Sequence, residues 1–359
     1  MRGLLVLSTP PKGLLSEARV LAYWMLFPMV VMAIDTPEKL RRFTIGMLVA
    51  GLWLAIAIVL SSLTGLKLFE GGALQELQTV GDKETGFFRS QPGGMYMVVF
   101  AVLLVLAKYA SKGWNLLPVV IAAGILCVGI VLNFGRGIWA ATAVGLVVLA
   151  LLFGVRRWLR IGVAFAVLFT LAMGALHLVR PQVIPAAVNR VLSVDDEIAV
   201  GSSFDWRRME NSYATAALMR SPVFGIGLGV PYRPTLQGGG DFKEMARYIH
   251  NSFFALMLKL GPLAALFPFF AAAAFFIKAR SVWRLPLRPD HRAILGAAIA
   301  VFGLPAFVTA FTQPEWVSTG NISLMATMMA LLVVIARFNT TAPAISAPPR
   351  RLYQSFAVS

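Results

Sequence analysis

The sequence has little charge and almost no cysteine. Charged residues make up 13% of the chain, against about 25% in soluble globular domains. The single cysteine, Cys127, lies inside an apolar run, where it can form no intrachain disulfide and has no neighbouring metal ligand. Only a short apolar run precedes Pro10 and Pro11, so we predict no cleaved signal peptide. These shortages exclude an ordinary soluble domain and a disulfide-stabilised framework.

Long apolar segments are what the sequence has instead. Hydrophobic residues make up 58% of the chain, and apolar runs long enough to cross a hydrocarbon layer of about 30 Å recur along it. We therefore predict an all-α polytopic membrane protein with about nine transmembrane helices. Their approximate ranges are 20–34, 43–63, 94–107, 115–132, 137–153, 161–179, 262–277, 293–311 and 320–337.

These spans divide the chain into four predicted parts. Residues 1–179 form an N-terminal transmembrane bundle of six spans, and residues 180–250 form a large external loop that carries short helices. Residues 251–338 supply three C-terminal transmembrane helices, and residues 339–359 form a cytoplasmic tail that we expect to be disordered. The chemistry is expected in the external loop, because this is the longest polar stretch of the sequence.

Periodicity predicts two short helices in and just after the external loop. Over 203–219, Trp206, Met209, Tyr213 and Ala217 recur at the spacing of one helical face. Residues 251–260 predict a second helix that ends at Gly261. At the start of the loop, by contrast, two prolines in 180–190 discourage a helix.

The net charge of +16 could indicate a nucleic-acid partner, but its distribution favours a membrane. With the 180–250 loop outside, most of the excess Lys and Arg falls in the segments that face the cytoplasm. This is the positive-inside pattern of membrane proteins. We therefore predict a lipid bilayer around the chain and no nucleic acid.

Three other polar features have simple interpretations. The loop at 64–92 is expected to be a solvated connector with one short helix near 73–80. The acidic run Asp195–Glu197 lacks spaced partners, so it is expected to be solvated and to bind no metal. The G-x-G-x-G at 225–229 follows no strand, so it indicates flexible turns and no dinucleotide site.

The external face carries a small set of residues that could perform chemistry: Arg136, Arg207, its neighbour Arg208, and His250. An arginine offers a fixed fork of donors that suits a diphosphate. A histidine can take a proton from a hydroxyl near neutral pH. Together, two guanidiniums and an imidazole suit the transfer of a group from a lipid diphosphate without a metal ion. Each residue alone could equally be a helix-end anchor, a solvated charge or a helix cap.

The order of these residues resembles the signature of the O-antigen ligase and polymerase superfamily. The resemblance covers roughly 130–275 and lies in Arg207-x14-Pro222-x2-Gly225-x-Gly227, followed by His250-Asn251 and a Leu-rich helix ending at Gly261. The segment Gly135-Arg136-Gly137-x-Trp139 is similar to the external helix end that this family places before its large periplasmic loop.

This resemblance implies a metal-independent, inverting glycosyltransferase at the periplasmic face of the bacterial inner (cytoplasmic) membrane, with no cofactor. The implied donor is an undecaprenyl-diphosphate-linked glycan. The acceptor is open between lipid A–core, another glycan repeat and a protein. By the same resemblance, Arg136 and Arg207 (or Arg208) would bind the diphosphate, and His250 would activate the acceptor hydroxyl.

Two alternatives from other classes stay open. The first is a polysaccharide or lipid transporter that makes no bond, and the second is a non-catalytic membrane scaffold. A transporter is expected to carry ionisable residues near the bilayer midplane. Here the conspicuous charges lie at one face, which favours an enzyme.

Overall fold

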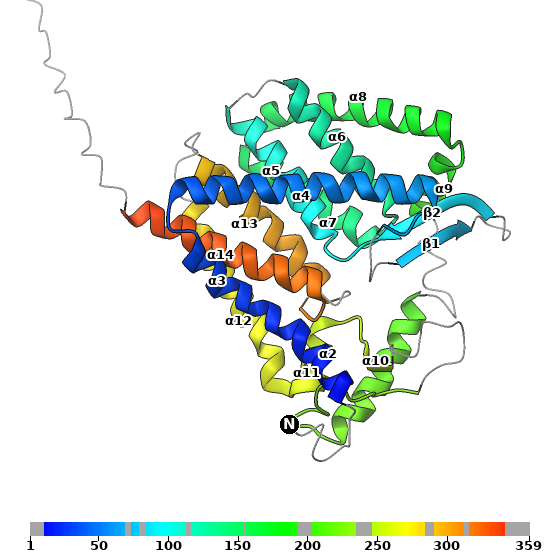
Figure 1. The fold of residues 1–359 in the computed structure, drawn as a ribbon, viewed down its shortest axis with the longest axis vertical. Helices are drawn as coiled ribbons and strands as arrows, with labels where there is room; N and C mark the ends of the chain where they lie inside the picture. The colour runs from blue at the N-terminus through cyan, green and yellow to red at the C-terminus, as the bar shows by residue number, and fades with distance from the viewer. Residues whose placement is uncertain are drawn as a thin grey trace, which may run out of the picture.

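The computed structural model describes residues 11–68, 73–78, 84–112, 116–153, 155–192, 203–234, 246–283, 291–311 and 316–341. This part of the chain is mainly helical (Figure 1). The helices are α2 (Pro11–Ala22), η1 (Tyr23–Met25), α3 (Leu26–Ala33), α4 (Pro37–Thr64), α5 (Tyr96–Lys112), α6 (Leu116–Leu132), α7 (Arg136–Phe153), α8 (Val155–Val179), α9 (Val183–Leu192), α10 (Ser203–Met219), α11 (Ser252–Leu260), α12 (Pro262–Trp283), α13 (His291–Thr309) and α14 (Thr319–Thr341).

Several of these helices are long and apolar enough to cross a membrane. Five such spans are found in the described chain: Pro11–Ala33, Pro37–Thr64, Pro262–Val282, His291–Thr309 and Thr319–Asn339. A sixth is formed by the end of α8 and the start of α9 if this pair, bent by 117°, counts as one span. The helices α5, α6 and α7 are apolar but shorter. The prediction of a multi-pass helical membrane protein is confirmed, while the number of nine spans stays a prediction.

The main hydrophobic core surrounds α5. Its residues from Val98 to Ala107 are all buried, as expected for a helix that is apolar all round. Helix α5 packs against α4, α6, α7 and α13, and α14 packs against α3 and α12. In Figure 1 the long helix α4 runs between the group that contains α5, α6 and α8 and the group that contains α3, α14 and α12.

A second, smaller hydrophobic cluster lies outside this bundle, around α10 and α11. It joins Ala214 and Ala217 of α10 to Ile226, Ile249 and Leu258. The two predicted helices are confirmed, since α10 spans the predicted 203–219, and α11 is capped by the Asn251 side chain, which accepts from the Phe254 N–H at 3.0 Å. Figure 1 shows α10 at the edge of the molecule, next to α11 and α2.

Glycines allow the loop after α10 to lie directly on α11. Gly225 has a φ of 66°, and a Cβ placed on it would lie 2.5 Å from the Leu258 carbonyl oxygen. The neighbouring Ile226 N–H donates to that same oxygen at 2.8 Å. The three glycines of the 225–229 segment all have positive φ. The prediction that they form turns is therefore confirmed.

Two local predictions are wrong. In place of a short helix near 73–80, strand β1 (Ala73–Gln78) pairs antiparallel with β2 (Glu84–Gln91), a partner that local periodicity cannot indicate. The prolines at the start of the external loop do not prevent helix α9, because Pro185 lies in its first turn. An N–H there has no helical partner to lose. The acidic run Asp195–Glu197 and the predicted tail beyond residue 341 lie outside the described residues.

Candidate functional site

The most distinctive contact in the predicted external loop joins Glu210 of α10 to His250, which lies just before α11. The imidazole Nδ1 of His250 is 2.7 Å from Oε2 of Glu210, and the backbone N–H of His250 lies 3.4 Å from the same oxygen. The side chain of Glu210 is 1% exposed, whereas that of His250 is 25% exposed. A buried carboxylate therefore holds a histidine that is still open to a substrate.

A guanidinium compensates the burial of this carboxylate. Moving a charge out of water is costly unless it is paired and hydrogen-bonded. Nη2 of Arg233 lies 3.3 Å from Oε1 of Glu210, and both side chains are almost fully buried. Each oxygen of Glu210 thus has its own partner, Arg233 on one side and His250 on the other.

Tyr232, the neighbour of Arg233 in the sequence, connects its loop to the segment that carries His250. Its hydroxyl donates to the Tyr248 carbonyl oxygen at 2.7 Å. Burial raises the pKa of Tyr232, and the negative charge of Glu210 raises it further. The phenol therefore stays neutral and serves as a hydrogen-bond donor.

The Glu210 contact determines which nitrogen of His250 can react. Because the carboxylate accepts from Nδ1–H, the lone pair of the ring is on Nε2. Within the described part of the chain, Nε2 has no hydrogen-bond partner. The Tyr248 ring packs edge-on against the imidazole with 5.0 Å between ring centroids. This arrangement of an oriented imidazole with a free basic nitrogen can accept a proton from a hydroxyl.

Glu210 was not among the residues predicted from the sequence, although a local signal was present. Among the α10 side chains that the structure describes, from Arg207 on, the buried ones are Glu210, Ala214 and Ala217, which lie at the 3–4 spacing of one helical face. The predicted face, based on Trp206, Met209 and Tyr213, is rotated from this one, and the two share Ala217. The alignment of Glu210 with two alanines on one helical face was the local signal that this carboxylate could be buried, although it says nothing of its partner.

The two neighbouring arginines of α10 differ in their surroundings. Arg207 lies one turn before Glu210 and is half-buried, while Arg208 is exposed. Nε of Arg207 is buried and has no hydrogen-bond partner in the described residues. Residues three apart share a helical face, so Arg207 lies on the side of Glu210 and His250. The geometry favours Arg207 over Arg208 as a ligand of a bound substrate.

Arg136 is the first residue of α7 and is half-buried. The turn before it is fixed by strand β2, because Nε of Arg89 donates to the Asn133 carbonyl oxygen at 3.1 Å and Nδ2 of Asn133 donates to the Ser90 carbonyl oxygen at 2.9 Å. The 64–92 segment thus does more than the solvated connector that the sequence predicted. A guanidinium at a helix N-terminus, where the dipole is positive, suits an anion.

Of the predicted residues, the structure relates Arg207 and His250 to each other through Glu210, which was not predicted. Glu210 and His250 are in contact, and Arg207 lies one turn away from Glu210. Arg136 belongs to α7, which packs against α5, α8 and α13, whereas α10 packs against α11. Convergence of Arg136 with the other residues therefore stays a prediction. In the described chain no group of three or more His, Cys, Asp or Glu residues could hold a metal ion.

Residues 120–269 match the family model described as O-antigen ligase. This segment includes Arg136, Arg207, Arg208, Glu210 and His250. No curated protein matches the chain. The family match confirms the resemblance that the sequence motifs indicated.

Proposed function

We propose that this membrane protein transfers a glycan from an undecaprenyl-diphosphate donor to an acceptor hydroxyl, because residues 120–269 match the family model described as O-antigen ligase. The reaction takes place at the periplasmic face of the bacterial inner membrane. The acceptor is lipid A–core or another glycan repeat. Both offer a sugar hydroxyl, so both need the same base.

In the proposed reaction, His250 acts as the general base. The acceptor O–H gives its proton to Nε2 of His250 as the acceptor oxygen attacks the anomeric carbon of the donor glycan. The bond between that carbon and the diphosphate oxygen breaks, and the electron pair leaves with undecaprenyl diphosphate. Attack on the face opposite the leaving group inverts the configuration at the anomeric carbon. The proton on His250 then returns to solvent.

The arginines bind the diphosphate in this proposal. The leaving group gains negative charge as the glycosidic bond breaks, and a guanidinium placed there stabilises the transition state more than the ground state. Arg207 is assigned this role because it lies on the same side of α10 as Glu210. Arg136 is assigned the second contact, with Arg208 as the alternative to Arg207. These fixed positive charges perform the role that a divalent cation has in other transferases, so the proposed reaction is metal-independent.

The observation that carries the proposal is the 2.7 Å contact between His250 Nδ1 and Glu210 Oε2. A buried carboxylate in this position orients the imidazole and stabilises the imidazolium that forms when a proton is taken. A proton-coupled transporter carries such ionisable pairs within its membrane spans, whereas Glu210 and His250 lie outside the candidate spans of the described chain. The pair therefore favours bond-making chemistry over polysaccharide or lipid transport alone.

Reconstitution tests the proposal. The purified protein is placed in liposomes with an undecaprenyl-diphosphate glycan and either lipid A–core or a glycan repeat as acceptor, and the joined product is measured. We expect His250→Ala to abolish transfer while the protein stays folded in the membrane. His177→Ala is the matched control, because His177 is an exposed histidine of α8. Transfer by His250→Ala at the wild-type rate would refute the assignment of the base.

A further inference from the structure

Arg233 lies behind the pair of Glu210 and His250 and has no part in the reaction as proposed above. Its Nη2 is 3.3 Å from Oε1 of Glu210, whereas Nδ1 of His250 is 2.7 Å from the other oxygen, Oε2. The side chains of Arg233 and Glu210 are both almost fully buried, and that of His250 is partly exposed. The three groups therefore form a row from the buried side to the open side, with the carboxylate in the middle. Any effect of Arg233 on the reaction has to act through this carboxylate.

The loop that carries Arg233 is fastened to the segment that carries His250. The Tyr232 N–H donates to the Ala246 carbonyl oxygen at 3.0 Å, and the Tyr232 hydroxyl donates to the Tyr248 carbonyl oxygen at 2.7 Å. The guanidinium carbon of Arg233 lies 5.9 Å from the centroid of the Tyr232 ring. These contacts fix the guanidinium relative to the imidazole.

A buried carboxylate with His250 as its sole partner would favour the charged form of the imidazole. An opposite charge within about 4–6 Å stabilises the ionised state of a group. An imidazolium carries a proton on both ring nitrogens, so Nε2 would have no lone pair with which to take a proton from a hydroxyl. The pair alone would therefore be a poor general base near neutral pH, however well the ring is oriented.

Arg233 supplies the positive charge that the buried carboxylate needs. The charge of Glu210 is then compensated while His250 is neutral, and the guanidinium opposes a second positive charge on the imidazole. A general base works best when it titrates near the pH at which the protein operates. The row of three groups meets this requirement better than the pair, and the carboxylate still orients the ring through Nδ1.

We propose that Arg233 is a positioning residue of the transfer reaction, whose charge holds Glu210 ionised and leaves Nε2 of His250 unprotonated in the resting protein. The inference rests on the proposed role of His250 as the general base. Without the guanidinium, His250 keeps its proton to a higher pH, so transfer is lost near neutral pH and recovered in more alkaline solution. A residue needed for packing alone would lower the rate equally at every pH.

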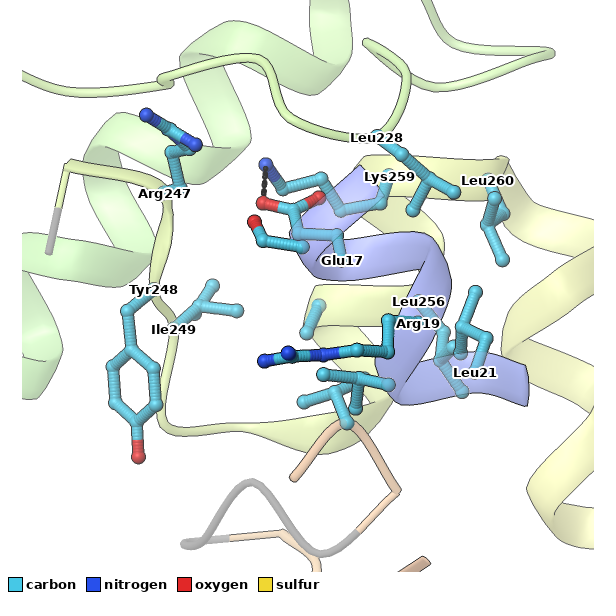
Figure 2. Close-up of a pocket in the computed structure, with 14 residues that line it drawn as sticks. Glu17, Arg19, Leu21, Leu228, Arg247, Tyr248, Ile249, Leu256, Lys259 and Leu260 are labelled. Carbon is cyan, nitrogen blue, oxygen red and sulfur yellow. Dashed lines mark hydrogen bonds and ion pairs between the residues drawn. The ribbon is translucent and has the colours of Figure 1, made fainter. Parts of the chain in front are cut away.

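Other charges also surround His250, but they are the same in every variant to be compared. Figure 2 shows Glu17 and Lys259 joined in the pocket beside Tyr248 and Ile249, with 3.0 Å between Oε1 and Nζ. Apart from Glu210 and Arg233, the ionisable side chains of the described elements around His250 are Arg207 and Tyr213 of α10, Tyr232 and Tyr248 beside the pair, and Glu17, Arg19, Arg247 and Lys259 around this pocket. A shift between variants at position 233 therefore reports the charge of Arg233.

The reaction of His250 with diethyl pyrocarbonate tests the inference, because this reagent modifies an imidazole nitrogen that carries no proton. The purified full chain is labelled in detergent over a range of pH, and mass spectrometry of the peptide that contains residue 250 gives the midpoint. We expect the midpoint of Arg233→Gln to lie about one to two pH units above that of the wild type. Arg233→Lys keeps the charge and should keep the wild-type midpoint. Arg220→Gln is the matched control and should also keep it, because Arg220 is an exposed arginine just after α10.

The outcomes separate this inference from the proposed function. An unshifted midpoint in Arg233→Gln, or an equal shift in Arg233→Lys, would overturn the role of the charge, even if the wild type transfers glycan normally. In the reconstituted transfer assay, the acid limb of kcat should move with the labelling midpoint. Labelling needs no turnover, so a shifted midpoint in a protein that transfers no glycan would refute the proposed function and still support the effect of Arg233 on His250.

Folding is checked for each variant by intrinsic tryptophan fluorescence during thermal unfolding, since Arg233→Gln leaves Glu210 buried with one partner fewer. If that variant does not fold, Glu210→Gln is compared with Glu210→Gln/Arg233→Gln, because neither of these buries a carboxylate at position 210. The midpoint should be higher in the double variant, which alone of the two lacks the positive charge. Equal midpoints in these two variants would overturn the proposal.

Discussion

The membrane bundle and the α10–α11 region bury different kinds of side chain. Around α5 the buried side chains are apolar, from Val98 to Ala107. In the described chain the buried charged residues are Glu210, Arg233 and Lys259, and all three belong to the region around α10 and α11. Buried charge costs stability unless it is paired, so a protein retains it where chemistry or binding requires it. The comparison separates an apolar part that supports the fold from the part to which we assign the function.

The largest effect is expected from removing the carboxylate itself. Glu210→Ala leaves Arg233 buried without its partner, which should lower the free energy of unfolding by about 3–5 kcal/mol. It also removes the group that orients His250, so transfer per folded molecule should be lost. Chemical denaturation in detergent and the reconstituted transfer assay measure the two effects. Leu103→Ala is the comparison from the bundle, because Leu103 is a fully buried residue of α5. It should reduce stability as well but leave the rate per folded molecule unchanged.

A more conservative change at the same position separates orientation from folding. Glu210→Gln keeps the shape of the side chain and removes its charge, so more of the protein should fold. We expect kcat to fall roughly 10²- to 10⁴-fold, with little change in KM for either substrate, because Glu210 is not expected to touch them. A wild-type kcat in this variant would show that the pair with His250 is only structural.

The same comparison explains how far sequence analysis could go. The bundle helices and α10 and α11 were predictable, because apolar length and 3.6-residue periodicity are local properties of the chain. The roles of Glu210 and Arg233 were not, because each depends on a partner that only the fold supplies. Glu210 meets His250 forty residues later, a separation that no local pattern encodes. The β1–β2 hairpin was missed for the same reason, since a strand is defined by its partner.

The next effect in size concerns the turn that holds the α10–α11 region together. Gly225→Ala places a side chain at a φ of 66° and 2.5 Å from the Leu258 carbonyl oxygen. We expect a loss of stability of about 1–3 kcal/mol and a lower transfer rate, because this contact positions the helix that follows His250. Gly124→Ala in α6 is the matched control, since no atom lies within 4 Å of a Cβ there. Equal stability of the two variants would show that the close approach at Gly225 does not constrain the region.

The smallest effect is also the one that best distinguishes two adjacent residues of α10. Arg207→Lys keeps the charge but loses the planar fork, and loss of one charge-assisted hydrogen bond to the diphosphate should reduce kcat/KM about tenfold. Arg208→Lys should have little effect, because Arg208 is exposed and faces away from Glu210. Both variants keep the net charge of the chain, so a difference between them reports geometry and not general attraction to the anionic donor. Initial rates at varied donor concentration measure it. A larger loss in Arg208→Lys than in Arg207→Lys would reverse the assignment and would mean that the substrate lies on the outer side of α10, away from His250.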